Sequence, residues 1–211
     1  MKLYSYWRSG TSYRVRIALA IKGASVEIVP VNLLDGAHKD ESFLTRNPQG
    51  LVPTLELDDG TLLSQSPAII EYLDETLPGP ELLPEDPLQR AEARHLSALI
   101  GCDIHPLQNL RVLKYLQDPL GHNRDEAFAW AAHFIAAGFE ALETLLSKAD
   151  TPFAMGDAPG VVECYLLPQL YAARRFGTDL SAVPRLLAIE KAAADWPDIT
   201  AAHPEQQIDA H

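Results

Sequence analysis

Residues 8–12 read Arg-Ser-Gly-Thr-Ser, a cluster of polar side chains close to the amino terminus. At the start of a helix, such hydroxyls and the free backbone N–H groups would converge on one point. The helix dipole favours an anion there, including a thiolate. Serine and threonine also cap helices without any further role. The segment therefore predicts either a thiolate-binding helix start or an ordinary N-cap.

A second group of candidate ligands lies in residues 47–55 (NPQGLVPTL) and 65–75 (QSPAIIEYLDE). A cis Val52–Pro53 bond would aim the Val52 backbone outward, where an extended peptide can pair with it. Gln65 and Ser66 stand at another expected helix start, which suits a carboxylate. Taken separately, the first segment is also typical of a turn and the second of a capped helix.

The elements that must position these residues follow from hydrophobic periodicity and turn signals. Asp59-Gly60 is a hairpin dipeptide, and Ser66-Pro67 is typical of a helix start. The order β-α-β-α-β-β-α makes a small mixed sheet with helices on its faces. The expected strands are 2–6, 26–30, 54–57 and 61–64, and the expected helices are 13–22, 40–46 and 66–77.

Residues 78–87 hold four of the chain's 16 prolines, which indicates a linker. Beyond it only helical periods recur, at 87–117, 124–148, 160–176 and 184–195. Gly160 is expected to cap the third of these helices, with Glu163 as the acidic residue of the cap. We expect a loosely held tail after Trp196. The predicted domains are 1–80 and an all-α domain at 87–211, joined by a linker at 81–86.

The chain has 17 Lys+Arg against 29 Asp+Glu, a net charge of -12. Such an acidic chain is a poor partner for nucleic acid or for anionic membranes. Cys102 and Cys164 are expected to be buried free thiols, and no histidine or cysteine spacing indicates a metal site. The start has no apolar stretch typical of a signal peptide, so we expect a cytoplasmic protein.

Four segments together resemble the zeta class of the glutathione transferase family. They are WRSGTSYRVRIAL (7–19), NPQGLVPTL (47–55), QSPAIIEYLDE (65–75) and GCDIHPLQN (101–109), and the likeness covers nearly the whole chain. The resemblance implies an α/β plus all-α protein, with a thioredoxin-like N-terminal domain and an all-helical C-terminal domain. It also implies glutathione as cosubstrate and a homodimer. Within the class, the first and last segments are most similar to bacterial maleylpyruvate isomerases.

The family pattern carries over to particular positions of this sequence. Thr11 stands where most zeta-class chains have cysteine, so a hydroxyl replaces a thiol there. The residues implied as catalytic are Arg8, Ser9, Thr11 and Arg175. Those implied to bind glutathione are Gln49, Val52, Pro53, Gln65, Ser66, His105 and Asn109, and those implied to bind the second substrate are Arg8, Arg111 and Arg175.

Several of these assignments have structural alternatives. The alternative for each arginine is a surface cation in an ion pair; we favour the binding role for Arg8 and Arg175, leave both open for Arg111, and expect Arg174 to be structural. His105 can simply precede a kink at Pro106. We expect Arg14 and Arg16, which lie along the first helix, to be structural.

The implied substrate class explains why an acidic protein would place arginines near its site. A dicarboxylate is repelled unless local cations reverse the field, and the planar fork of arginine meets a carboxylate bidentately. The implied activity is glutathione-dependent isomerisation of maleylpyruvate to fumarylpyruvate, as in gentisate catabolism. Maleylacetoacetate isomerase, a transferase that conjugates other electrophiles, and a non-catalytic binding module remain as alternatives.

Overall fold

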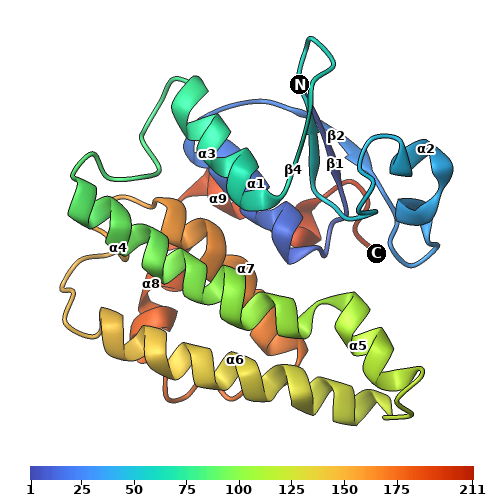
Figure 1. Ribbon diagram of the computed structural model, residues 1–211. Helices are drawn as coiled ribbons and strands as arrows, with labels where there is room; N and C mark the ends of the chain where they lie inside the picture. The colour runs from blue at the N-terminus through green and yellow to red at the C-terminus, as the bar shows by residue number, and fades with distance from the viewer. The chain divides into compact units, whose positions relative to one another are not determined.

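A computed structural model describes all 211 residues and divides the chain into two compact units (Figure 1). The first unit comprises Met1–Leu82 together with Ala194–His211, and the second comprises Leu83–Ala193. The boundary between the two units thus falls between Leu82 and Leu83, inside the proline-rich segment 78–87. Each unit contains its own set of fully buried apolar side chains.

The first unit is built on a four-stranded sheet with the strand order β2-β1-β3-β4. β1 pairs parallel to β2 and antiparallel to β3, and β3 and β4 form the expected hairpin. This is the predicted thioredoxin-like arrangement. Its elements are β1 (Lys2–Ser5), α1 (Gly10–Ile21), β2 (Glu27–Pro30), η1 (Ala37–Lys39), α2 (Glu41–Leu44), β3 (Thr54–Glu56), β4 (Leu62–Ser64), α3 (Ser66–Thr76), α9 (Pro197–Ala201) and η4 (Pro204–Gln206).

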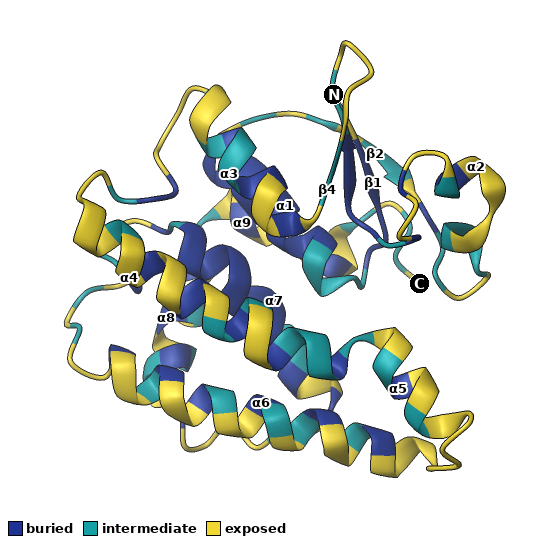
Figure 2. Ribbon diagram, viewed as in Figure 1, coloured by how far each residue is buried: buried dark blue, intermediate teal, exposed yellow.

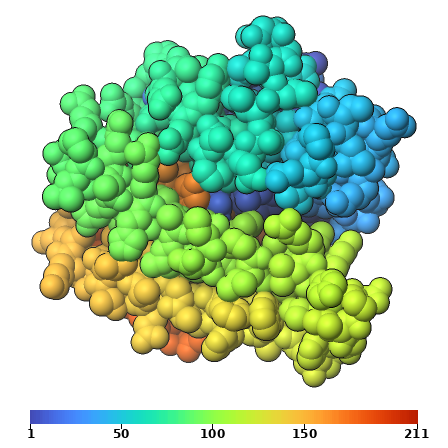
Figure 3. Space-filling view, viewed as in Figure 1, coloured from blue at the N-terminus to red at the C-terminus, as the bar shows by residue number.

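The hairpin turns at Asp59 and Gly60, as the dipeptide predicts. Gly60 has a φ of 84°, a conformation that glycine adopts without a steric penalty. The Asp59 carboxylate accepts the Thr61 amide at 2.9 Å, which closes the turn. All of residues 58–61 are exposed, and this tip, in teal, stands at the surface in Figure 3.

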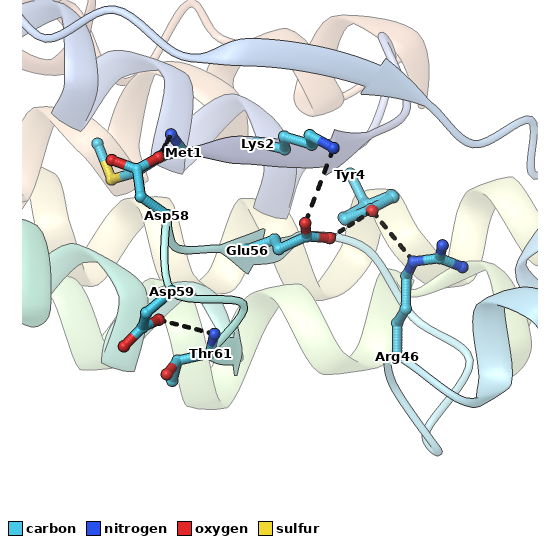
Figure 4. A network of polar contacts seen from close by, with 8 residues as sticks. All are labelled: Met1, Lys2, Tyr4, Arg46, Glu56, Asp58, Asp59 and Thr61. Atoms are coloured by element: carbon cyan, nitrogen blue, oxygen red, sulfur yellow. Dashed lines mark hydrogen bonds and ion pairs between the residues drawn. The ribbon is translucent and has the colours of Figure 1, made fainter.

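A polar network fastens the segment around α2 to the sheet (Figure 4). The Tyr4 hydroxyl donates to a Glu56 carboxylate oxygen at 2.6 Å and accepts from Arg46 Nε at 3.0 Å. Lys2 Nζ lies 3.8 Å from the other Glu56 oxygen. Burial and the hydrogen bond to Glu56 raise the pKa of Tyr4, and the Arg46 charge opposes that shift. Since Phe43 also packs edge-on against Tyr4, α2 is held to β1 by both polar and apolar contacts.

The C-terminal residues differ from the expectation in two ways. The sequence predicts a loosely held tail of the helical domain, whereas the structure places Ala194–His211 in the first unit. The physical reason is the buried guanidinium of Arg16, which needs acceptors and donates through Nε to the Ala202 carbonyl at 3.0 Å. The His203 ring also meets the Tyr13 ring edge-on at 5.9 Å between centroids.

The second unit is all-helical, as expected. Its elements are α4 (Pro87–Ala98), a π-helical segment η2 (Leu99–Ile104), a 3-10 segment η3 (His105–Gln108), α5 (Leu110–Gln117), α6 (Arg124–Leu146), α7 (Val161–Arg175) and α8 (Pro184–Ala194). The first ten residues of α7, Val161–Leu170, are all buried, whereas α6 alternates buried and exposed positions (Figure 2). In neither unit is any helix both long enough and apolar enough to cross a bilayer.

The expected single helical period at 87–117 is interrupted. A π-helical and a 3-10 segment separate α4 from α5 between residues 99 and 108. Pro106 has no N–H with which to continue an α-helical ladder, so the chain tightens into the 3-10 turn that contains it. Cys102 in the π-helical segment is exposed, which corrects the expectation that it is buried, while Cys164 is buried as expected.

Glu163 closes the start of α7 in the way the sequence indicates. Its carboxylate accepts the Gly160 amide at 2.7 Å and the Ala154 amide at 2.9 Å. Burial raises the pKa of the Glu163 carboxyl, while the two amides and the Arg185 charge oppose this shift. Glycine at the cap has no side chain to complete the reciprocal bond, so Glu163 alone satisfies this helix start.

Replacing Glu163 by alanine should therefore lower the free energy of unfolding by about 2–4 kcal/mol, because two amides lose their acceptor. Glu190→Ala is the matched control, since Glu190 forms a surface ion pair with Arg174 and its loss should be below about 1 kcal/mol. Denaturant unfolding of both variants measures the difference. Equal losses in the two variants would contradict the structural role of Glu163.

Candidate active site

Ser9 caps α1, and the helix begins at Gly10, three residues before the predicted start. The Ser9 backbone is extended, with φ of -70° and ψ of 118°, and its Oγ accepts the Ser12 amide at 3.3 Å. Thr11 therefore lies within the first helical turn, and its Oγ1 is 3.0 Å from Ser9 Oγ. The two hydroxyls expected to serve a thiolate are neighbours at the positive end of the helix dipole.

Thr11 also joins the helix start to the loop that precedes β3. Its hydroxyl donates to the Val52 carbonyl at 2.9 Å, and the Val52–Pro53 bond is cis. A threonine hydroxyl has a single hydrogen, and Val52 takes it. Ser9 must then be the donor in the Ser9–Thr11 contact, so Ser9 holds the hydrogen that can be turned toward a bound anion.

Asn47 is buried and shapes the loop from which Gln49 and Val52 project. Its Nδ2 donates to the Leu51 carbonyl at 2.7 Å and to Thr54 Oγ1 at 3.2 Å, and its Oδ1 accepts the Gln49 amide at 3.1 Å. Asn47 is not among the predicted site residues. The signal was the Asn-Pro-x-Gly order, in which asparagine closes a turn on its own backbone.

Gln65 and Ser66 lie at the start of α3, as predicted, but their roles differ. Gln65 is the cap residue with a φ of 73°, the only positive φ outside glycine, and strained backbone of this kind gathers at functional sites. Its exposed side chain donates from Nε2 to Gln49 Oε1 at 2.7 Å. Ser66 is buried, and its Oγ accepts from Arg14 Nη1 at 3.5 Å. Gln49, Val52, Pro53, Gln65 and Ser66 are thus gathered by two loops of one unit.

The candidate arginines of the two units differ in how they are paired. Arg8 is half-buried with its guanidinium 5.2 Å from the centre of the Trp7 ring, and no acidic side chain pairs with it. Arg174 is bound bidentately by Glu190 at 2.7 and 2.5 Å, the ion pair expected of it. Arg175 is the exposed last residue of α7, with its guanidinium 4.4 Å from the Phe176 ring centre.

The remaining candidates share one stretch of the second unit. His105 opens η3, and Asn109 caps α5 by accepting the Arg111 amide at 3.2 Å. Arg111 is exposed. Gln108, which had drawn no attention in the sequence, donates from Nε2 to Gln169 Oε1 at 2.7 Å and so ties η3 to α7.

This arrangement can hold an anionic sulfur at the start of α1 and a carboxylate at the start of α3. No group of three His, Cys, Asp or Glu side chains is placed to hold a metal ion. The groups that the described site offers are hydroxyl donors, helix dipoles and arginines, which suit an anionic sulfur and a carboxylate.

Comparison with known proteins identifies the family. The family model described as glutathione S-transferase, N-terminal domain, matches residues 1–75. Maleylacetoacetate isomerase from Pseudomonas aeruginosa is 50% identical over 99% of this chain and 98% of its own length. The chain belongs to the zeta class of the glutathione transferases. Two solved zeta-type structures show how closely the backbone follows that class.

The first of these structures is the holo form of maleylpyruvate isomerase, a bacterial zeta-class protein. It is 43% identical, with 100% of both chains covered and a TM-score of 0.97. The second is maleylacetoacetate isomerase from Anaeromyxobacter dehalogenans 2CP-1, with dicarboxyethyl glutathione and citrate bound in its active site. It is 43% identical over 100% of this chain and 97% of that chain, with a TM-score of 0.89.

Asn47→Ala should lower the free energy of unfolding by about 2–3 kcal/mol, because it leaves buried loop groups without partners. It should also speed hydrogen exchange at the Gln49 amide. Asn32→Ala is the matched control, since Asn32 bonds Leu34 and Asp35 in an exposed turn and should lose less than about 1 kcal/mol. Unchanged exchange at Gln49 would show that Asn47 does not hold the loop.

Proposed function

We propose that this chain is a glutathione-dependent cis–trans isomerase that converts maleylpyruvate to fumarylpyruvate. The observation that carries the proposal is the pair of hydroxyls, Ser9 and Thr11, at the start of α1 with no thiol beside them. A site of this kind binds and activates a sulfur that another molecule supplies. The zeta-class relatives named as isomerases of two maleyl keto acids support the choice of reaction.

Glutathione is proposed to bind along the loop before β3. The Val52 amide makes no hydrogen bond within the chain, so it is open to an extended peptide. The γ-glutamyl carboxylate then lies at the start of α3, where the Ser66 amide and the helix dipole favour an anion. Gln65 and Gln49, already bonded to each other, flank that position. His105 and Asn109 are proposed as further glutathione ligands.

The glutathione thiol is proposed to lie at the start of α1. The dipole of α1 and a hydrogen bond from Ser9 lower the pKa of the thiol, so that the thiolate predominates at neutral pH. Thr11 holds the start of α1 against the Val52 loop, because its hydroxyl donates to the Val52 carbonyl, and its oxygen leaves the Ser9 hydrogen free to turn to the sulfur. We therefore assign the donor role to Ser9 and a positioning role to Thr11.

The second substrate is proposed to be held through its two carboxylates by Arg8, Arg111 and Arg175. Arg8 has no acidic partner, so a ligand carboxylate does not have to displace one. On a chain with a net charge of -12, such cations are needed to reverse the local field for a dianion. Dicarboxyethyl glutathione, bound in the active site of one relative, is a ligand in which dicarboxylate and thiol are joined.

The reaction then proceeds by reversible addition. The sulfur forms a bond to one alkene carbon, and the electron pair of the double bond moves through the conjugated ketone to its oxygen, giving an enolate. Nearby cations stabilise that charge. The former double bond is now single and rotates. Collapse of the enolate expels the thiolate and leaves the trans alkene, so glutathione is regenerated and no oxidant or reductant is required.

Maleylacetoacetate is the second candidate substrate, favoured by the name of the relative that is 50% identical. It carries the same cis enone between two carboxylates and is slightly longer. Both reactions would use the same thiolate and arginines, so the two substrates differ only in the length that the arginines must span.

We also propose a homodimer, which light scattering would test.

The deciding assay follows the absorbance of maleylpyruvate and of maleylacetoacetate with and without glutathione. We expect turnover that requires glutathione, faster with maleylpyruvate, and none with the dimethyl ester, which has no charge for the arginines to hold. Turnover that is indifferent to glutathione would refute the mechanism. Activity on a chlorinated aromatic with none on either maleyl substrate would favour a conjugating transferase. Failure to bind a glutathione column would favour a non-catalytic protein that lacks the glutathione site.

The variants Ser9→Gly and Thr11→Val distinguish the roles of the two hydroxyls. Glycine replaces serine at a cap with a loss of only a few tenths of a kcal/mol. Ser9→Gly should nevertheless reduce kcat by about 100-fold, because one donor to the thiolate is gone. Thr11→Val should reduce it by about tenfold or less, since Thr11 acts only by joining the start of α1 to the Val52 loop. A larger effect at Thr11 than at Ser9 would reverse the assignment.

A further inference from the structure

The turn between β1 and α1 is held at its backbone by residues from far along the chain. The Ser9 amide donates to the Tyr6 carbonyl at 2.9 Å, which makes residues 6–9 a closed turn. Inside it, both polar groups of the Trp7 backbone are engaged. The Trp7 amide donates to the Asp209 carboxylate at 3.0 Å, and the Trp7 carbonyl accepts from Arg16 Nη2 at 2.9 Å. Arg8 and Ser9 follow Trp7 directly.

Arg16 is itself fixed by the C-terminal residues. Its side chain is buried, its Nε donates to the Ala202 carbonyl at 3.0 Å, and its Nη1 donates to Ser5 Oγ at 3.1 Å. One guanidinium therefore connects β1, the turn and the C-terminal segment. The planar fork of arginine suits such a three-way junction, because its donors point in fixed directions.

Residues 202–211, here named the C-terminal strap, also pack on the turn through side chains. The His211 ring lies 5.6 Å from the Trp7 ring between centroids. Ala210 packs against the apolar cluster that contains Trp7 and Val52. The strap thus contacts both the turn that carries Ser9 and the cluster beneath the Val52 loop, within the first unit.

A carboxylate that accepts a backbone amide forms a strong, directional hydrogen bond. Here that bond lies two residues before the hydroxyl proposed to stabilise the thiolate. Small displacements of a catalytic group reduce rates disproportionately, so a bond that fixes this peptide has a consequence for chemistry as well as for stability.

We propose that Asp209 is a positioning residue for the thiolate site, acting with Arg16 through the backbone of Trp7 to fix the Ser9 hydroxyl. This inference rests on the proposed function of Ser9. It assigns to the C-terminal strap a part in activating glutathione, although the strap supplies no group that touches the sulfur. Loss of the Asp209 carboxylate should change the thiol pKa of bound glutathione more than it changes the affinity for glutathione.

Asp209→Ala tests the proposal, with Glu205→Ala as the matched control. Glu205 is an exposed carboxylate of the same strap, and no hydrogen bond or ion pair involves its side chain. The readouts are the ultraviolet absorbance of bound glutathione thiolate against pH, kcat, KM for glutathione, and thermal unfolding. Asp209→Asn keeps an oxygen that can accept the Trp7 amide and serves as the conservative variant.

In Asp209→Ala we expect the thiol pKa of bound glutathione to rise by about one unit and kcat to fall about tenfold. The KM for glutathione should change less than about twofold, because the Val52 and Ser66 contacts remain. Asp209→Asn should recover most of the thiolate signal, and Glu205→Ala should match the unaltered protein. If Asp209→Ala is too unstable to assay, Asp209→Glu should show the same rise in pKa, because it displaces the carboxylate.

The proposal is overturned if Asp209→Ala and Glu205→Ala have the same thiol pKa and kcat. It is also overturned if kcat in Asp209→Ala falls only in proportion to the unfolded fraction. Absence of a thiolate signal in the unaltered protein would instead refute the proposed function, and this inference with it. The two failures are therefore distinguishable in one experiment.

Discussion

The hydrogen bond from the Thr11 hydroxyl to the Val52 carbonyl is the contact on which the rest of the site depends. It joins the start of α1 to the loop before β3, so the positions proposed to bind the sulfur and the backbone of glutathione have a fixed separation. Asn47 holds the loop from one side, and Arg16 with Asp209 holds the turn from the other. None of these supports needs to touch a ligand, yet each limits where the Ser9 hydroxyl can be.

The arginines of this acidic chain divide into two groups by burial. Arg14 and Arg16 lie inside the first unit and connect helices, strands and the C-terminal strap through hydrogen bonds. Arg111 and Arg175 are exposed on the second unit, and Arg8 is half-buried without an acidic partner. Guanidinium groups thus serve structure where carbonyls and hydroxyls surround them. Arg8, which has no acidic partner, is proposed to bind a carboxylate of the substrate.

The second unit shows how a helical domain accommodates an irregular segment. Gly138 on α6 leaves room for Ile104, since a Cβ at that position would lie 2.3 Å from the Ile104 side chain. Ile104 ends the π-helical segment directly before His105. A glycine on α6 therefore lets the Ile104 side chain pack closely at the end of the π-helical segment.

Local signals in the sequence determined much of this protein: the Asp59-Gly60 hairpin, the capped start of α1, the start of α3 at Ser66-Pro67, the all-helical second unit and the candidate site residues of the first. These depend on contacts within a few residues, which propensity and turn chemistry govern. Only the tertiary structure decided that the strap joins the first unit and that Ser9, rather than Thr11, holds the available hydrogen. Both follow from bonds between segments more than 40 residues apart, Trp7 to Asp209 and Thr11 to Val52, which no local pattern encodes.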